Sequence, residues 1–176
     1  DCVAAARYLI SEGVVNPEKI AIKGGSAGGF TVLAALAFYQ DFSAGASRYG
    51  VADLEILARD THKFESRYLD RLIGEYPQQK EKYFNRSPIN HTEKFTSPMI
   101  ILQGSEDAVV PPNQAELVVD SLKENGIRHS YLLFEGEGHG FRKAENIIAA
   151  LEAEYSFFSQ IFDFQPPDTI VKVSIQ

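Results

Sequence analysis

A serine framed by glycines is the residue of this chain whose setting most clearly indicates chemistry. Residues 24–28 read Gly-Gly-Ser-Ala-Gly, the pattern G-x-S-x-G, with Ser26 at the centre. An apolar run, 20–22, precedes the motif, and a helix-like run, 29–39, follows it. A strand, a sharp turn with serine at its tip and a helix are typical of a nucleophile elbow, whose strained turn lifts the hydroxyl above the sheet. The glycines let strand and helix approach closely, because they carry no Cβ.

The motif alone has two competing interpretations. Ordinary glycine and serine frequencies give G-x-S-x-G by chance in about 5% of chains of this length, so a glycine-rich turn is one alternative. A phosphate-binding loop is the other, but no Gly-Lys-Ser or Gly-Lys-Thr follows and the spacing is not G-x-G-x-x-G. The choice depends on whether the chain also supplies a base and an acid.

A base and an acid follow two further apolar runs. A serine hydroxyl is a weak nucleophile and needs a base, usually a histidine oriented by a carboxylate. The run 99–102 leads into a loop with Asp107, and the run 131–134 leads into a loop with His139. Serine, acid, histidine is the chain order of α/β-hydrolases, and the carboxyl ends of parallel strands border the ligand crevice of open α/β sheets. We therefore expect Ser26, Asp107 and His139 to form a triad. Glu106, next to Asp107, is the alternative candidate for the acid. Asp107 and His139 could alternatively be ordinary loop residues without a catalytic role.

The elements that must position these residues alternate between strand and helix. This alternation predicts a parallel sheet with right-handed crossovers, a three-layer αβα architecture of the α/β-hydrolase type. The polar segment 54–96 is expected to be mostly helical, and 170–175 alternates like an exposed strand. The predicted strands are 19–23, 44–49, 99–103 and 130–134, and the main predicted helices are 27–39, 113–125 and 144–162.

Composition excludes several other classes of protein. The 176 residues suffice for about one domain, and the net charge of −7 argues against nucleic-acid and anionic-membrane partners. No apolar run has the length of a membrane span. Cys2 is the single cysteine, so no internal disulfide forms, which fits a reducing, cytoplasmic location. No His, Cys or carboxylate spacing indicates a metal site, and we expect no cofactor.

Four motifs together resemble the catalytic domain of the prolyl oligopeptidase family of serine peptidases. The stretch 64–69, Phe-Glu-Ser-Arg-Tyr-Leu, is most similar to the acylaminoacyl-peptidase and dipeptidyl-aminopeptidase branch. By position, the resemblance implies that Ser26 is the nucleophile, that Asp107 orients, that His139 is base and then acid, and that the backbone N–H of Ala27 is one oxyanion donor. The motifs are Gly-Gly-Ser-Ala-Gly-Gly-Phe at 24–30, Ser-Pro-Ile at 87–89, Gly-x-x-Asp-x-x-Val-Pro at 104–111 and Gly-Glu-Gly-His-Gly-Phe at 136–141.

The resemblance also implies a longer parent chain. Residues 1–164 are expected to be the C-terminal portion of a hydrolase domain truncated at its N-terminal side, and 165–176 a C-terminal tail. An upstream β-propeller, the remaining hydrolase segment and a second oxyanion donor are expected before Asp1, with short peptides as substrates. The first strand is then a free sheet edge, through which copies of the chain could associate. An esterase with the same triad and a non-catalytic hydrolase-like module are the alternative functions.

Overall fold

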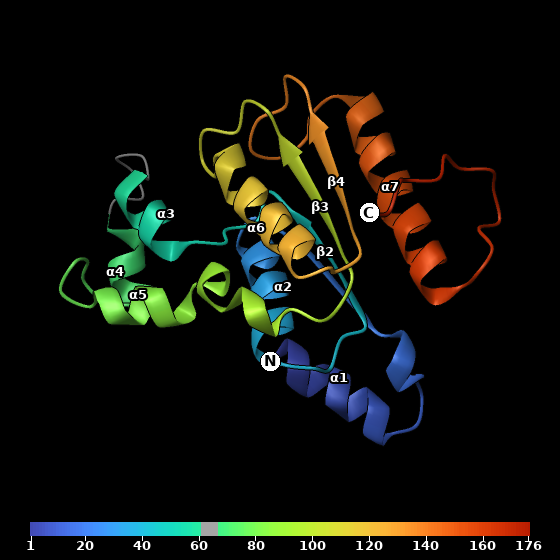
Figure 1. The fold of residues 1–176 in the computed structure, drawn as a ribbon, viewed down its shortest axis with the longest axis horizontal. Helices are drawn as coiled ribbons and strands as arrows, with labels where there is room; N and C mark the ends of the chain where they lie inside the picture. The colour runs from blue at the N-terminus through green and yellow to red at the C-terminus, as the bar shows by residue number, and fades with distance from the viewer. Residues whose placement is uncertain (61–66) are drawn as a thin grey trace.

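The structure, a computed structural model, describes residues 1–60 and 67–176. Its centre is a four-stranded parallel sheet in the order β1-β2-β3-β4, so that neighbours in the chain are neighbours in the sheet (Figure 1). Because all strands run in one direction, their carboxyl ends share one edge of the sheet. The strands are β1 (Ala21–Gly25), β2 (Ala44–Arg48), β3 (Met99–Gly104) and β4 (His129–Phe134).

Helices supply the crossovers and both covering layers. α2 connects β1 to β2, and α6 connects β3 to β4, while a chain of short helices fills the connection from β2 to β3. None of the helices in the described residues is long and apolar enough to cross a membrane. The helices are α1 (Cys2–Ser11), η1 (Pro17–Lys19), α2 (Ala27–Phe38), α3 (Leu54–Asp60), α4 (Tyr68–Leu72), α5 (Lys80–Arg86), η2 (Pro88–Lys94), α6 (Pro112–Glu124) and α7 (Ala144–Phe162), of which η1 and η2 are 3-10 helices.

The side-chain alternation of a strand divides the core into two halves. On β3, Met99 and Ile101 point to the layer formed by α2 and α6, whereas Ile100 and Leu102 point to α7. All four side chains are buried, and a strand that is apolar on both faces is expected where helices cover both sides of a parallel sheet. The expected three-layer αβα architecture and parallel sheet are therefore confirmed.

The predicted elements match the observed ones closely, apart from two places. β1 begins two residues later than predicted, because Pro17–Lys19 form a 3-10 turn in which the Asn16 side chain accepts a hydrogen bond from the amide of Glu18. The segment 54–96 contains only helices and connections among its described residues, as predicted. The first part of the stretch 64–69, residues 64–66, lies outside the described residues.

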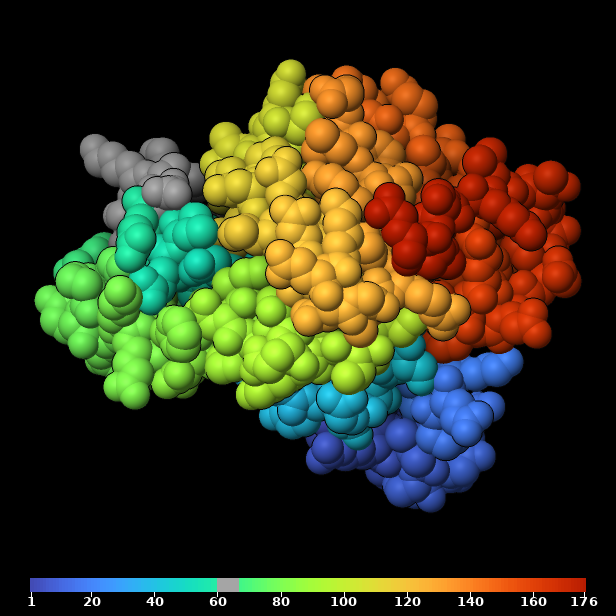
Figure 2. All heavy atoms as spheres, viewed as in Figure 1, coloured from blue at the N-terminus to red at the C-terminus, as the bar shows by residue number. Residues whose placement is uncertain are grey.

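The expectation of an exposed strand at 170–175 is wrong. These residues form no strand, although the backbone of Gln176 exchanges two hydrogen bonds with His129 at the start of β4, 2.8 and 3.1 Å long. Val173 and Ile175 pack against the half of the core that lies between the sheet and α7, so the alternating apolar residues cover this part of the core. In Figure 2 the tail, in dark red, lies against the orange region that contains β4.

Candidate active site

Ser26 occupies the turn between β1 and α2 in a strained backbone conformation. Its φ of 55° and ψ of −119° are rare for a residue with a side chain, and such conformations are concentrated at functional sites. The turn is held by the Ser26 amide, which donates to the carbonyl of Arg48 at 3.0 Å. A Cβ on Gly24 would lie 2.5 Å from the backbone carbonyl of Gly28, so the close approach of strand and helix requires glycine there.

His139 contacts both of the other predicted site residues. Its Nε2 lies 2.8 Å from Ser26 Oγ, and its Nδ1 lies 2.9 Å from Asp107 Oδ2. Asp107 Oδ1 accepts the amides of Val109 at 2.9 Å and Val110 at 2.8 Å, which fixes the carboxylate. Because a carboxylate accepts, Nδ1 donates to Asp107, and Nε2 accepts a hydrogen bond from the Ser26 hydroxyl.

The three residues meet because each follows the carboxyl end of a strand. Ser26 follows β1, Asp107 lies three residues after β3 and His139 lies five residues after β4. The Asp107 side chain is fully buried, whereas 22% of the His139 side chain is exposed. Glu106, the competing acid, is exposed and binds the neighbouring loop only through its amide, which donates to the carbonyl of Glu137 at 2.9 Å.

Ala27 begins α2 directly beside Ser26. The first amides of a helix have no acceptor within the helix, and they carry the positive end of the helix dipole. Ala27 and Ser26 border the same pocket. The amide of Ala27 thus belongs to a helix end that suits a developing negative charge.

Tyr49 belongs to the site although the sequence reasoning did not identify it. The residue follows β2, has a φ of 38°, and places its ring edge-on against His139, with 5.0 Å between the ring centres. It also packs against Phe141 at 5.2 Å. A Cβ on Gly25 would lie 2.9 Å from the Tyr49 ring, so the second glycine of the motif leaves room for this side chain. No local sequence pattern marks Tyr49.

A largely apolar pocket opens beside Ser26 and His139. Its volume is about 580 Å³, within the range of small-molecule sites. The walls come from α2, the segment after β2, the loop after Asp107 and the helices α3, α4 and α5. The apolar lining includes Phe30, Val51, Leu54, Leu57, Leu69 and Val110.

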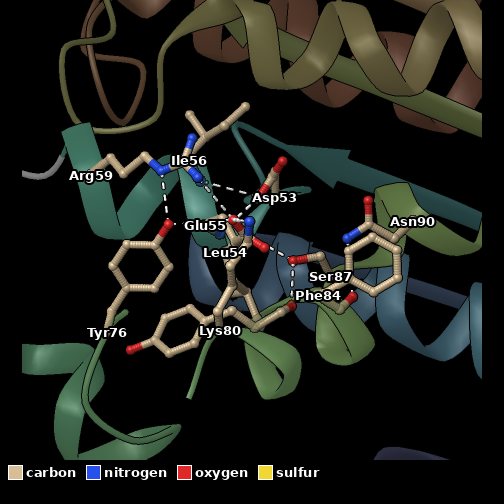
Figure 3. Close-up of polar contacts among 11 residues, drawn as sticks. Asp53, Leu54, Glu55, Ile56, Arg59, Tyr76, Lys80, Phe84, Ser87 and Asn90 are labelled. Carbon is tan, nitrogen blue, oxygen red and sulfur yellow. Dashed lines mark hydrogen bonds and ion pairs between the residues drawn. The ribbon is translucent and has the colours of Figure 1, made fainter. Parts of the chain in front are cut away.

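A buried carboxylate fixes the α3 wall of this pocket (Figure 3). Glu55 Oε2 lies 3.0 Å from Arg59 Nη2, 3.7 Å from Lys80 Nζ and 3.4 Å from the Tyr76 hydroxyl. Arg59 also donates to the same Tyr76 hydroxyl at 2.9 Å. The contacts tie α3 to α5 and to the segment between α4 and α5, on the periphery of the pocket.

The start of α3 is held by two further side chains, also drawn in Figure 3. Asp53 Oδ1 accepts the amides of Glu55 at 2.7 Å and Ile56 at 3.1 Å, which is a helix N-cap. The Ser87 hydroxyl accepts the amide of Leu54 at 2.9 Å and donates to the carbonyl of Tyr83 at 2.7 Å. The serine of the Ser-Pro-Ile motif thus anchors the pocket wall.

The described residues contain no group of three His, Cys, Asp or Glu side chains that could hold a metal ion. The strand–turn–helix at Ser26, the parallel sheet and the helices on both of its faces define an α/β-hydrolase. The model of the prolyl oligopeptidase family matches residues 1–165, and the chain belongs to this family of serine peptidases. The resemblance noted in the sequence is therefore confirmed.

The individual relatives include two peptidases and one probable ester hydrolase. The chain is 42% identical to a puromycin-hydrolyzing peptidase of Mycobacterium tuberculosis, with a TM-score of 0.94 over 99% of this chain and 27% of that one. It is 28% identical to dipeptidyl aminopeptidase BIII of Pseudoxanthomonas mexicana over 91% of this chain and 24% of that protein. It is also 34% identical to a probable carboxylic ester hydrolase, LipM, of Mycobacterium tuberculosis over 69% of this chain and 32% of that protein. The chain thus spans about a quarter to a third of the length of these relatives.

Proposed function

We propose that this chain carries the Ser26–His139–Asp107 triad of a peptidase that hydrolyses short peptides through an acyl-enzyme. The observation that carries the proposal is the continuous line of hydrogen bonds from Ser26 Oγ through the His139 ring to Asp107, 2.8 and 2.9 Å long. The membership of a peptidase family supports the reaction class.

In the proposed reaction, Ser26 Oγ attacks the carbonyl carbon of the scissile bond while His139 Nε2 takes the hydroxyl proton. The tetrahedral oxyanion accepts a hydrogen bond from the amide of Ala27, and the buried Asp107 carboxylate stabilises the imidazolium. Collapse breaks the C–N bond, and the amine leaves with the proton from His139. Water then repeats the sequence on the ester and regenerates Ser26.

The pocket supports an apolar residue on one side of the scissile bond. Its walls carry mainly leucine, valine and phenylalanine side chains, and Ser26 and His139 lie at its border. Burying an apolar side chain against these walls removes it from water, which stabilises the bound substrate. Tyr68 and Arg86 supply polar groups to the same lining. We expect dipeptide and aminoacyl derivatives with a large apolar acyl residue to be better substrates than those with glycine, because a larger apolar side chain buries more area against this lining.

We further propose that residues 1–164 form the C-terminal portion of a hydrolase domain and that 165–176 form its tail. The family match over 1–165 and the coverage of about a quarter of the peptidase relatives support this division. The proposed partners are the remaining hydrolase segment and a β-propeller of the same parent chain. A cytoplasmic location, for which the lone Cys2 thiol was the argument, stays a prediction.

The outer edge of β1 is the proposed contact for a partner strand. In the described part of the chain, β1 pairs with β2 alone, and an unpaired edge is a template for another strand. We expect the upstream hydrolase segment to occupy this edge and expect residues 1–176 expressed alone to self-associate. Light scattering after size-exclusion chromatography tests the second expectation, and a stable monomer contradicts it.

A carboxylesterase is the second candidate, favoured by the similarity to the probable ester hydrolase LipM. The natural chain that contains this sequence is assayed with phenylalanine p-nitroanilide and with p-nitrophenyl acetate, alongside its Ser26→Ala variant. Amide hydrolysis that disappears in the variant supports the peptidase, whereas hydrolysis of the ester alone supports the esterase. Failure of a fluorophosphonate to label Ser26 contradicts both and favours a non-catalytic module.

A further inference from the structure

Glu137 is a buried carboxylate that the proposed reaction does not use. It lies two residues before His139, only 2% of the residue is exposed, and no described lysine or arginine forms an ion pair with it. Burial of a charged group costs free energy unless the group is fully hydrogen-bonded. The hydrogen-bond partners of Glu137 therefore indicate how its charge is stabilised and which part of the chain it holds.

Three donors satisfy the carboxylate, two from the residues directly before α7 and one from its first turn. The amides of Arg142 and Lys143 donate to Oε2 and Oε1, each at 2.9 Å, and the Asn146 side chain donates to Oε1 at 2.9 Å. Burial favours the neutral acid, but the hydrogen bonds from Asn146, Arg142 and Lys143 outweigh it, so the pKa of Glu137 is lowered. The negative charge also faces the positive end of the α7 dipole.

The backbone of Glu137 is fixed to the loop that carries Asp107. The Glu137 carbonyl accepts the amide of Glu106 at 2.9 Å, and the Ser105 hydroxyl accepts the amide of Gly136 at 2.9 Å. The two loops touch so closely that a Cβ on Gly104 would lie 2.4 Å from the Glu137 carbonyl oxygen. These contacts fix the start of the His139 loop relative to the loop that carries Asp107.

These two sets of contacts enclose His139. The backbone of Glu137 is attached to the Asp107 loop, and its side chain reaches forward to the amides five and six residues later. The carboxylate therefore closes a hydrogen-bonded loop of the backbone, and this loop contains residues 138–141, the segment that carries the imidazole. We propose that Glu137 is a positioning residue, which holds the His139 loop so that the imidazole meets Ser26 and Asp107 together. This role rests on the proposed peptidase function.

The test compares variants of the natural chain that contains residues 1–176. Glu137→Gln keeps the shape but presents an NH₂ group to donors, and Asn146→Ala removes one of the three donors. Glu135→Gln is the matched control, because it removes the same charge from an exposed position of the same loop. For each variant, kcat and KM for phenylalanine p-nitroanilide and the rate of fluorophosphonate labelling are expressed per folded molecule, with the folded fraction from circular dichroism.

A misplacement of about 1 Å in a catalytic group costs on the order of a hundredfold in rate. We expect Glu137→Gln to lower kcat by roughly 10- to 100-fold with KM changed less than about twofold. Asn146→Ala should give a smaller loss of kcat in the same direction, and Glu135→Gln should match wild type. A purely structural role changes the folded fraction but leaves kcat per folded molecule intact.

The positioning role is overturned if the kcat of Glu137→Gln per folded molecule equals that of the wild type. If Glu137→Gln does not fold, a kcat of Asn146→Ala equal to that of the wild type overturns it. The peptidase function is judged separately by labelling of the wild-type chain and its absence in Ser26→Ala. An unlabelled wild-type chain overturns both proposals, whereas a labelled chain with an unaffected Glu137→Gln variant overturns the positioning role alone.

Discussion

Replacing Asp107 by asparagine is the sharpest test of the acid in the proposed triad, because the surroundings restrict how the amide can bind. The asparagine oxygen can keep the hydrogen bonds from the amides of Val109 and Val110, but its NH₂ group then faces His139 Nδ1. The opposite orientation of the amide would place its NH₂ group against the backbone N–H groups of Val109 and Val110. Each buried donor left without an acceptor costs about 1–3 kcal/mol. The first arrangement is therefore favoured.

In that arrangement the imidazole carries its proton on the wrong nitrogen. Nδ1 must accept from the asparagine, so Nε2 holds the proton and points it at Ser26 Oγ, 2.8 Å away. His139 can then no longer take the serine proton. A comparable loss of the correct tautomer in another triad costs about 10⁴-fold in kcat, which corresponds to about 5.4 kcal/mol in the barrier.

The assay measures kcat/KM for phenylalanine p-nitroanilide on the natural chain, with circular dichroism to verify folding. Glu106→Gln is the matched control, because Glu106 is the adjacent acid and its side chain is exposed. We expect a loss near 10⁴-fold for Asp107→Asn and less than about twofold for Glu106→Gln. Activity within tenfold of wild type for Asp107→Asn, combined with a dead Glu106→Gln variant, refutes the assignment of the acid.

Three further predictions concern the nucleophile, the elbow and the acid side of the stability profile. Ser26→Ala should lower kcat by about 10⁶-fold and abolish fluorophosphonate labelling, and retained labelling contradicts the choice of nucleophile. Gly24→Ala should destabilise the fold by about 1–3 kcal/mol in denaturant unfolding, because the added Cβ would lie 2.5 Å from backbone atoms of Gly28. Gly28→Ala is the control. A Cβ at Gly28 would have no neighbour within 4 Å, so this change should alter the free energy of unfolding by less than about 0.5 kcal/mol. Equal changes in the free energy of unfolding for the alanine variants of Gly24 and Gly28 refute the steric argument. The pKa of Glu137 is lowered in the folded protein, so its contribution to stability is present above the ordinary pKa of 4.5 and is lost as the pH falls through the lower folded value. Glu137→Gln should therefore reduce the fall of the melting temperature at acid pH. An unchanged dependence of the melting temperature on pH contradicts this.

Local sequence determined the elements around the site. The glycine spacing at 24–28 and the apolar runs on either side predict the turn at Ser26, because strained backbone and close strand–helix contact depend on those few residues. The helix predicted at 144–162 is observed with the same bounds, since its apolar periodicity and its flanking glycine-rich loop are both local. Alternation of strands and helices similarly predicts the parallel sheet, because parallel strands need a long crossover connection, which is usually a helix.

The family resemblance favoured Asp107 over the adjacent Glu106, and the tertiary structure shows that the Asp107 side chain is the one that contacts His139. Asp107 and Glu106 have the same charge and follow the same strand, so their sequence positions differ by one residue. In the fold, two amides turn the Asp107 carboxylate inwards to His139, whereas Glu106 is exposed. The direction of a loop side chain depends on hydrogen bonds and packing, which residue type and charge alone do not encode.

Contacts between distant segments account for the rest of the site. Ser26 and His139 are 113 residues apart, and the Tyr49 ring that packs on His139 comes from the segment after β2. The pocket wall formed by α3 and α4 depends on the buried Glu55 and on Ser87, which follows α5. The sequence by itself determined which residues could react and which elements carry them, because those signals lie within a few positions. The pocket, the hydrogen bonds that Glu137 makes across the His139 loop and the contact between Asp107 and His139 were decided by the tertiary structure, because packing and buried hydrogen bonds join residues far apart in the chain.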